Sequence, residues 1–123
     1  MPLVIFIDDS KTTLALAGMA ADSMSIEAKE YLQAEVALAE IKAGMKPDLI
    51  ITDLNMPIMN GFEFFEELRK IESTKNTPCF ILSSETKEEI KQQGKALGVT
   101  GWISKPFNIP QLQQIITRIL DLK

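Results

Sequence analysis

Reactive polar side chains stand at the ends of short apolar runs in this sequence. In chain order they are Asp8 and Asp9, Asp53, Ser83 and Lys105. Carboxylates bind hard cations and can attack phosphorus, whereas an ammonium group and a hydroxyl group donate hydrogen bonds to anions. The chain has no histidine, which excludes serine–histidine and cysteine–histidine catalysis and histidine metal ligands. The chemistry must therefore rest on carboxylates, hydroxyls, lysine and any metal ion that the carboxylates bind.

The elements that position these residues follow a β/α alternation. Short continuous apolar runs alternate with longer amphipathic stretches, which is typical of a parallel sheet with helices on both faces. We expect strands at 3–7, 28–32, 49–52, 79–82 and 102–104. We expect helices at 11–24, 34–43, 62–71 and 86–97, and a last helix that Asn108 caps and Pro110 opens. Ser10 is the expected cap of the first helix, and Thr86 with Glu89 forms an expected capping box.

The positions of the acidic residues predict a metal site. In an open parallel sheet the binding crevice lies outside the carboxyl ends of the strands, where every polar break falls. If the first and third strands are neighbours, Asp8, Asp9 and Asp53 share one pocket. Three such charges repel strongly unless a cation neutralises them or their pKa values rise. All-oxygen ligation in a partly hydrated site favours Mg²⁺ over zinc or copper.

Asp53 has the position of a nucleophile, because it stands alone after an apolar run. Lys105 and the Ser83 hydroxyl would then donate to the oxygens of a transferred phosphoryl group. A plainer interpretation is that the aspartates only cap helices or face solvent. Three aspartates at matching strand ends, with a Lys-Pro pair at another, favour the site over that interpretation.

Together these residues resemble the receiver domain of response regulators. The resemblance spans the chain and rests on four motifs: Asp8-Asp9, Asp53-Leu54-Asn55-Met56-Pro57 with Asn60-Gly61, Ser83, and Lys105-Pro106-Phe107. It implies a flavodoxin-like, doubly wound α/β fold whose five-stranded parallel sheet has the strand order 2-1-3-4-5, with helices on both faces.

The resemblance also implies a role for each residue. Asp53 would be the phosphoacceptor. Mg²⁺ would be bound by Asp9, Asp53 and the backbone carbonyl of Asn55, with Asp8 assisting partly through water. Lys105 and Ser83 would contact the phosphoryl group, and the Lys105-Pro106 bond would be cis. Trp102 occupies the aromatic switch position, where relatives more often carry Tyr or Phe, and would move from exposed to buried. The alternative for Trp102 is a fixed packing role.

The implied function is that of a phosphoacceptor switch in a two-component system, not of a turnover enzyme. A sensor histidine kinase or phosphotransfer protein would supply the phosphoryl group. The surface formed by 86–97, 102–104 and the last helix would then change its affinity for a target protein, with chemotaxis as one candidate pathway.

Two other classes stay open. The first is an aspartyl-phosphate phosphatase of the haloacid-dehalogenase type, although Asn55 stands where that class needs an acid/base Asp. The second is a flavodoxin-like binder of a small ligand, although no Gly-rich phosphate loop follows the first strand.

Length and charge bound the remaining expectations. A chain of 123 residues predicts one receiver domain, 1–123, with no output domain. The net charge of −4 argues against direct nucleic-acid binding, and no apolar run approaches the ~20 residues that span a bilayer. The chain start lacks the basic region of a secretion signal, and the single Cys79 cannot form an internal disulfide, so a cytoplasmic location is expected.

Overall fold

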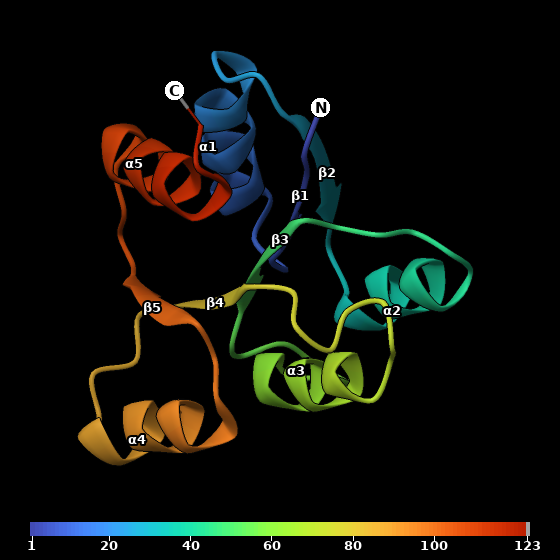
Figure 1. Cartoon of the computed structure of the whole chain (residues 1–123). Helices are drawn as coiled ribbons and strands as arrows, with labels where there is room; N and C mark the ends of the chain where they lie inside the picture. The colour runs from blue at the N-terminus through green and yellow to red at the C-terminus, as the bar shows by residue number, and fades with distance from the viewer. Residues whose placement is uncertain (123) are drawn as a thin grey trace.

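Five parallel strands form the central sheet, in the order β2-β1-β3-β4-β5 (Figure 1). The computed structural model describes residues 1–122. The strands are β1 (Leu3–Ile7), β2 (Glu27–Tyr31), β3 (Leu49–Asp53), β4 (Cys79–Ser83) and β5 (Gly101–Ser104). The predicted α/β fold and its strand order are therefore confirmed.

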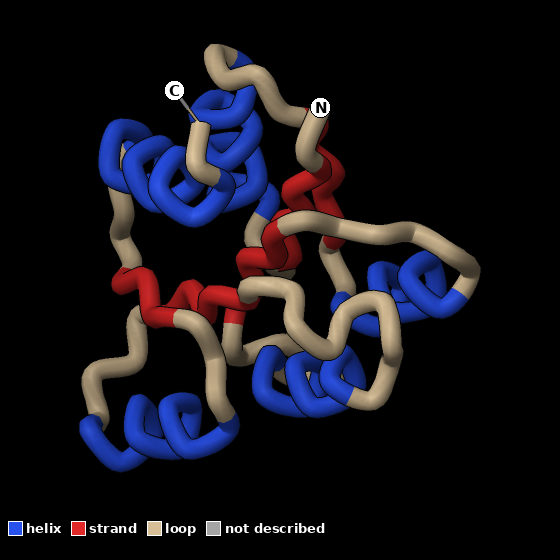
Figure 2. Tube along the Cα trace, in the orientation of Figure 1, coloured by secondary structure: helices blue, strands red, loops and turns tan. Residues whose placement is uncertain are grey.

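Helices cover both faces of the sheet. They are α1 (Lys11–Asp22), α2 (Ala34–Lys42), α3 (Gly61–Arg69), α4 (Glu88–Leu97) and α5 (Ile109–Leu120). Figures 1 and 2 show α1 and α5 on one side of the sheet and α2, α3 and α4 on the other. Within residues 1–122, no helix combines the length and apolarity needed to cross a bilayer.

The central strands divide the core into two layers because successive side chains of a strand point to opposite faces. On β1, Val4 and Phe6 pack into the cluster beneath α1 and α5, whereas Ile5 and Ile7 pack into the cluster beneath α2 and α3. All four side chains are buried. This burial on both faces explains the unbroken apolar runs in the sequence.

Element boundaries differ from expectation by one or two residues. β2 begins at Glu27 rather than 28, because four of its five residues are exposed and leave no apolar pattern to fix the register. α1 ends at Asp22 rather than 24. α3 ends at Arg69 rather than 71, where the guanidinium donates to the carbonyl oxygens of Thr74 and Thr77 and fixes the following turn.

The expected capping box of Thr86 and Glu89 is wrong. α4 begins at Glu88, and its cap residue Lys87 makes no side-chain capping bond. The Glu85 carboxylate accepts hydrogen bonds from the backbone N–H groups of Thr86 and Lys87, at 3.1 and 2.9 Å. Glu85 thus satisfies amides before the first turn, and the helix starts two residues later than expected. The expected caps at Ser10 and Asn108 are confirmed.

Gly61 lets the start of α3 lie directly against the end of β3. A Cβ atom at this position would lie 2.5 Å from the Asp53 carbonyl oxygen and 3.1 Å from Leu54 Cα. Both neighbours are backbone atoms, which cannot rotate away as a side chain can. The Gly61 N–H donates to the Leu54 carbonyl at 2.9 Å, and this bond closes the loop that follows Asp53.

We predict that Gly61→Ala lowers the free energy of unfolding by about 2 kcal/mol, because the methyl group forces α3 away from β3. The measurement is urea denaturation followed by circular dichroism. Gly18→Ala is the matched control, because its Cβ meets only the flexible carboxylate of Glu30, at 2.7 Å. That control should stay within about 1 kcal/mol of wild type. Equal destabilisation by both variants would contradict the close-approach argument.

Candidate functional site

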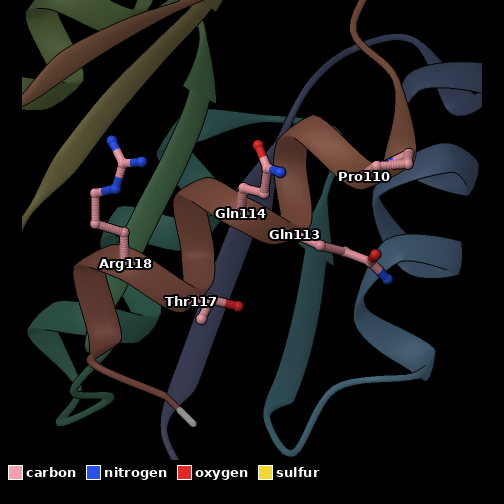
Figure 3. A pocket seen from close by; sticks show the side chains of 5 residues that line it. All are labelled: Pro110, Gln113, Gln114, Thr117 and Arg118. Carbon is pink, nitrogen blue, oxygen red and sulfur yellow. The ribbon is translucent and has the colours of Figure 1, made fainter.

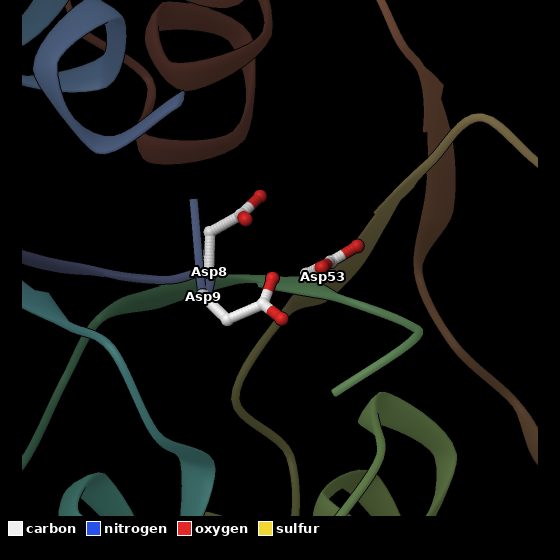
Figure 4. A group of neighbouring side chains, drawn as sticks. All are labelled: Asp8, Asp9 and Asp53. Atoms are coloured by element: carbon white, nitrogen blue, oxygen red, sulfur yellow. The ribbon is translucent and has the colours of Figure 1, made fainter. Parts of the chain in front are cut away.

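The register of the sheet brings the acidic residues together. Ile7 of β1 pairs with Thr52 of β3, so Asp8 and Asp53 follow at neighbouring strand ends. Carboxylate oxygens of Asp8, Asp9 and Asp53 lie within 4.8 Å of one another. Figure 4 shows the three side chains gathered at this edge of the sheet. The shared pocket predicted from the sequence is therefore present, and we call these three residues the acidic group.

Backbone hydrogen bonds hold the two buried carboxylates in place. Asp8 is fully buried, and its Oδ1 accepts from the Ser10 N–H at 2.8 Å. Asp53 is 6% exposed, and its Oδ1 accepts from the Leu54 N–H at 2.9 Å. Asp9 faces solvent. The group thus combines two fixed carboxylates with one that water reaches.

Lys105 joins the acidic group from the end of β5. Its Nζ lies 2.8 Å from Asp8 Oδ2 and 3.3 Å from Asp53 Oδ1. The Lys105 N–H donates to the Ser83 carbonyl at 2.9 Å, which ties the two strand ends together. The Lys105-Pro106 bond is cis, as expected. The structure therefore places the predicted lysine between the two buried aspartates.

The surroundings raise the pKa of Asp53 to about 6. Burial is the main cause and the Asp8 charge adds to it, whereas the Lys105 ammonium and the Leu54 N–H act in the opposite direction. For Lys105, burial alone would lower the pKa, but hydrogen bonds and attraction to Asp8 and Asp53 outweigh burial and raise it. Lys105 therefore stays charged near neutral pH, while Asp53 sits close to its own titration.

The acidic group fits a divalent cation. Asp8 Oδ2 is buried, and its polar partner among residues 1–122 is the Lys105 ammonium, 2.8 Å away. Three carboxylates against one ammonium leave a negative charge at a partly buried edge, which a small cation would balance. Hard oxygen ligands with one solvent-exposed member suit a cation that keeps part of its water. The acidic group is therefore capable of binding a divalent metal.

Ser83 and Trp102 lie on the strands next to the acidic group. Ser83 is buried at the end of β4, and its Oγ accepts from the Glu85 N–H at 2.9 Å. The Trp102 ring lies 6.2 Å from the Phe62 ring, centroid to centroid, and a Cβ at Gly94 would lie 3.2 Å from Trp102 Cζ3. The Trp102 Nε1–H is buried without an acceptor among residues 1–122. The ring is thus held in packing, and its movement remains a prediction.

Sequence reasoning missed the conformation of the loop after Asp53. Asn55 and Ile58 both face solvent in this loop. Ile58 has a φ of 73°, and the Met59 N–H donates across it to the Pro57 carbonyl at 2.8 Å. This is a γ-turn around a β-branched residue, which costs about 1–3 kcal/mol. No sequence signal marks this turn, because Gly or Asn is the usual residue at positive φ.

A separate hollow lies on the outer surface of α5. Its lining residues are Pro110, Gln113, Gln114, Thr117 and Arg118 (Figure 3). Arg118 is the single charged side chain of its lining, so the hollow holds no carboxylate ligand. The reactive chemistry therefore belongs to the strand ends and not to α5.

Comparison with known proteins identifies the family. The family model described as the response regulator receiver domain matches residues 4–117. The chain therefore belongs to the response regulator receiver domain family. Members of this family serve as phosphoacceptors in signalling and pair with histidine kinases, so the chain is a switch rather than a turnover enzyme. Membership of this family supports the phosphoacceptor switch over the two alternatives, the phosphatase and the small-ligand binder.

Three similar proteins show how much of this chain, and of each relative, the similarity covers. The crystal structure of chemotaxis protein CheY4 of Vibrio cholerae is 37% identical, with a TM-score of 0.89, and the match covers 97% of this chain and 98% of that one. The sensor histidine kinase CheAY of Helicobacter pylori is 31% identical over 122 residues, or 98% of this chain. Chemotaxis protein CheY-3 of Vibrio cholerae is 32% identical over 60% of this chain. The chain spans only 15% of the length of CheAY and 57% of CheY-3.

The raised pKa of Asp53 predicts a pH-dependent stability difference between wild type and Asp53→Asn in EDTA. The folded chain holds a proton on Asp53 up to about pH 6, whereas an unfolded Asp releases it near pH 4. Between these pH values Asp53 ionises in the unfolded chain but stays protonated in the folded chain. A rise in pH therefore favours the unfolded chain and lowers the stability of wild type. We expect the variant to be more stable by about 2 kcal/mol at pH 7 and nearly equal at pH 4. Urea denaturation across this range measures the difference, and a difference independent of pH would contradict the assignment.

Proposed function

We propose that Asp53 is the phosphoacceptor and that it takes its phosphoryl group from a phosphohistidine on a partner protein. The observation that carries this proposal is the ion pairing of Lys105 with both Asp8 and Asp53 beside the solvent-exposed Asp9. The proposal is supported by the meeting of three carboxylates and one ammonium group at one edge of the sheet. The chain has no histidine, so the proposed donor histidine lies outside these 123 residues.

The two oxygens of Asp53 have different surroundings. Oδ1 is held by the Leu54 N–H and by Lys105 Nζ, at 2.9 and 3.3 Å. Oδ2 accepts no hydrogen bond from residues 1–122, so we assign it as the attacking oxygen. Its electron pair forms the O–P bond of an acyl phosphate while the N–P bond of the phosphohistidine breaks. The bonding pair leaves with the imidazole nitrogen, which takes a proton from water.

The neighbouring groups then receive the phosphoryl oxygens. Lys105 donates from its ammonium, and Ser83 donates from its hydroxyl after leaving its contact with the Glu85 N–H. Asp8, Asp9, Asp53 and the backbone carbonyl of Asn55 are the proposed Mg²⁺ ligands, with Asp8 acting partly through water. Bound Mg²⁺ would neutralise negative charge on the phosphoryl oxygens during transfer.

Two surfaces serve the proposed partners. A mostly apolar pocket, lined in part by Thr13, Leu16 and Phe107, adjoins Lys105 on the α1 side and suits contact with the donor. The α4-β5-α5 face is the proposed target surface, because it carries Trp102 and follows directly from Ser83. The relatives CheY4 and CheY-3 are chemotaxis proteins, which supports chemotaxis as the pathway.

We predict that Asp53→Asn abolishes phosphorylation by acetyl phosphate with Mg²⁺, because the amide nitrogen replaces a nucleophilic oxygen. Intact mass spectrometry should show one added phosphoryl group on wild type and none on the variant. The fold of the variant should persist, as judged by circular dichroism. A variant phosphorylated at the wild-type rate would refute the proposal.

The metal part of this experiment has its own control. Mg²⁺ should raise the melting temperature of wild type by mass action, and Asp9→Ala should remove that shift along with most of the phosphorylation. A Mg²⁺ shift that survives in Asp9→Ala would place the metal elsewhere.

We predict that Trp102 fluorescence reports activation. Beryllofluoride with Mg²⁺ should draw the Ser83 hydroxyl toward Asp53 and free space beside β4. The Trp102 Nε1–H is buried without an acceptor among residues 1–122. A movement of the ring into this space would change the polarity around the indole, so the emission maximum should shift. Ser83→Ala should weaken this response while Asp53 remains phosphorylatable. Unchanged emission, under conditions where target binding strengthens, would show that Trp102 has only a packing role.

A further inference from the structure

Three large apolar side chains are exposed at the sheet edge that carries Asp53, on the side of α2 and α3. Leu32 lies in the β2–α2 loop and is 43% exposed, Val36 lies in the first turn of α2 and is 44% exposed, and Ile58 lies in the β3–α3 loop and is 82% exposed. We call these three residues the apolar rim. The other exposed large apolar residues within 1–122 are Met1 and Met19. Three of the five exposed large apolar residues within 1–122 therefore lie in the segments that follow β2 and β3, at the edge of the sheet that holds the acidic group.

The two halves of the apolar rim rest on one core. Tyr31 and Ala34, which flank Leu32, belong to the same buried cluster as Met56 of the β3–α3 loop. Met59, next to Ile58, also packs against that cluster. Figure 1 shows α2 and α3 side by side on this face of the sheet. The apolar rim therefore lies over one buried layer, on the α2–α3 side of the sheet.

The most exposed residues around the rim carry no charge. In the β2–α2 loop, the first turn of α2 and the β3–α3 loop they are Leu32, Gln33, Val36, Asn55, Pro57 and Ile58, and the charged side chain of these segments is the half-buried Glu35. The chain as a whole is 24% charged, so this stretch of surface is distinctive. Without lysine or arginine it does not suit nucleic acid or an anionic membrane. Its chemistry fits a protein surface.

The backbone strain at Ile58 gives a second, independent indication. Both ends of the loop are anchored, by the Gly61 N–H bond to the Leu54 carbonyl and by the capping box of Asn60 and Glu63. The γ-turn holds the Ile58 side chain outward at a φ of 73°. Asn or Gly would adopt this conformation with less strain. An apolar β-branched residue at this position is therefore costly for folding and is explained by a contact outside the chain.

We propose that the apolar rim is a docking surface for the histidine-bearing protein that phosphorylates Asp53. This inference rests on the proposed function. During transfer the phosphohistidine of the donor has to reach the attacking oxygen of Asp53, so the donor covers this edge of the sheet. The rim is continuous with that edge on the α2 side, and the pocket at Thr13 and Leu16 adjoins it on the α1 side. A donor seated between them contacts apolar surface on both sides.

The test measures phosphotransfer from the ATP-phosphorylated histidine kinases and phosphotransfer proteins of the source organism, using the one that phosphorylates wild type fastest. Ile58→Asn should lower kcat/KM for this donor about fivefold or more, mainly through a higher KM. The rate with acetyl phosphate should stay within about twofold. The melting temperature of Ile58→Asn should rise by about 3 °C or more, because strain is removed. The double variant Leu32→Asn with Val36→Gln should lower kcat/KM in the same way.

Met19→Gln is the matched control, because Met19 is 58% exposed and lies in the second half of α1, away from the carboxyl edge. It should leave both reactions unchanged. Wild-type transfer rates in the rim variants overturn the docking proposal. Ultracentrifugation that shows a dimer of wild type and a monomer of Ile58→Asn would also overturn it, because the rim would then join two copies of the chain. A wild type that reacts with acetyl phosphate but with no phosphohistidine protein would overturn it as well. Failure of wild type to react with acetyl phosphate would instead overturn the proposed function.

Discussion

The ion pairing of Lys105 with Asp8 and Asp53 is the interaction on which the site depends. Two carboxylates, one fully buried and one 6% exposed, cannot both ionise at a protein edge without a nearby positive charge. Lys105 supplies that charge, although it lies 52 positions after Asp53 in the sequence. The order of the strands makes this contact possible. β1 and β3, which precede Asp8 and carry Asp53, are neighbours, and only β4 separates β3 from β5, which Lys105 follows.

The same charge balance explains why phosphorylation and metal binding belong together in the proposed function. One ammonium leaves the acidic group with excess negative charge, and a phosphoryl group adds more. A divalent cation at the acidic group would therefore favour the acyl phosphate by attraction to both. The raised pKa of Asp53 fits this interpretation, because burial and the Asp8 charge disfavour its ionised form. A bound cation would favour that form. The structure thus couples the ionisation of Asp53 to the charges around it.

The fold and the acidic group were predictable because each reactive residue interrupts an apolar run at a strand end. Features set by local competition were not predictable. Thr86 has the sequence pattern of a capping residue, but α4 does not begin there. The backbone N–H groups of Thr86 and Lys87 donate hydrogen bonds to the carboxylate of Glu85 instead. The β2 register was uncertain because its exposed residues show no alternation. The γ-turn at Ile58 was missed because its residue type is the opposite of what positive φ favours.

The packing of α4 indicates which part of the molecule can respond to the site. Gly94 is its only buried residue and lies against the rings of Phe62 and Trp102. The half-buried Ile90 and Leu97 of α4 pack against the same small cluster. By comparison, α3 buries five residues, including three phenylalanines. Elements with little buried apolar surface open at the lowest free-energy cost. α4 is also the helix joined to Ser83, through the Glu85 N–H bond and the Glu85 carboxylate. In the proposed function, a change in the Ser83 hydrogen bond would therefore act first on α4, the helix with the least buried surface, and the signal would leave the site in the direction of α4 and β5.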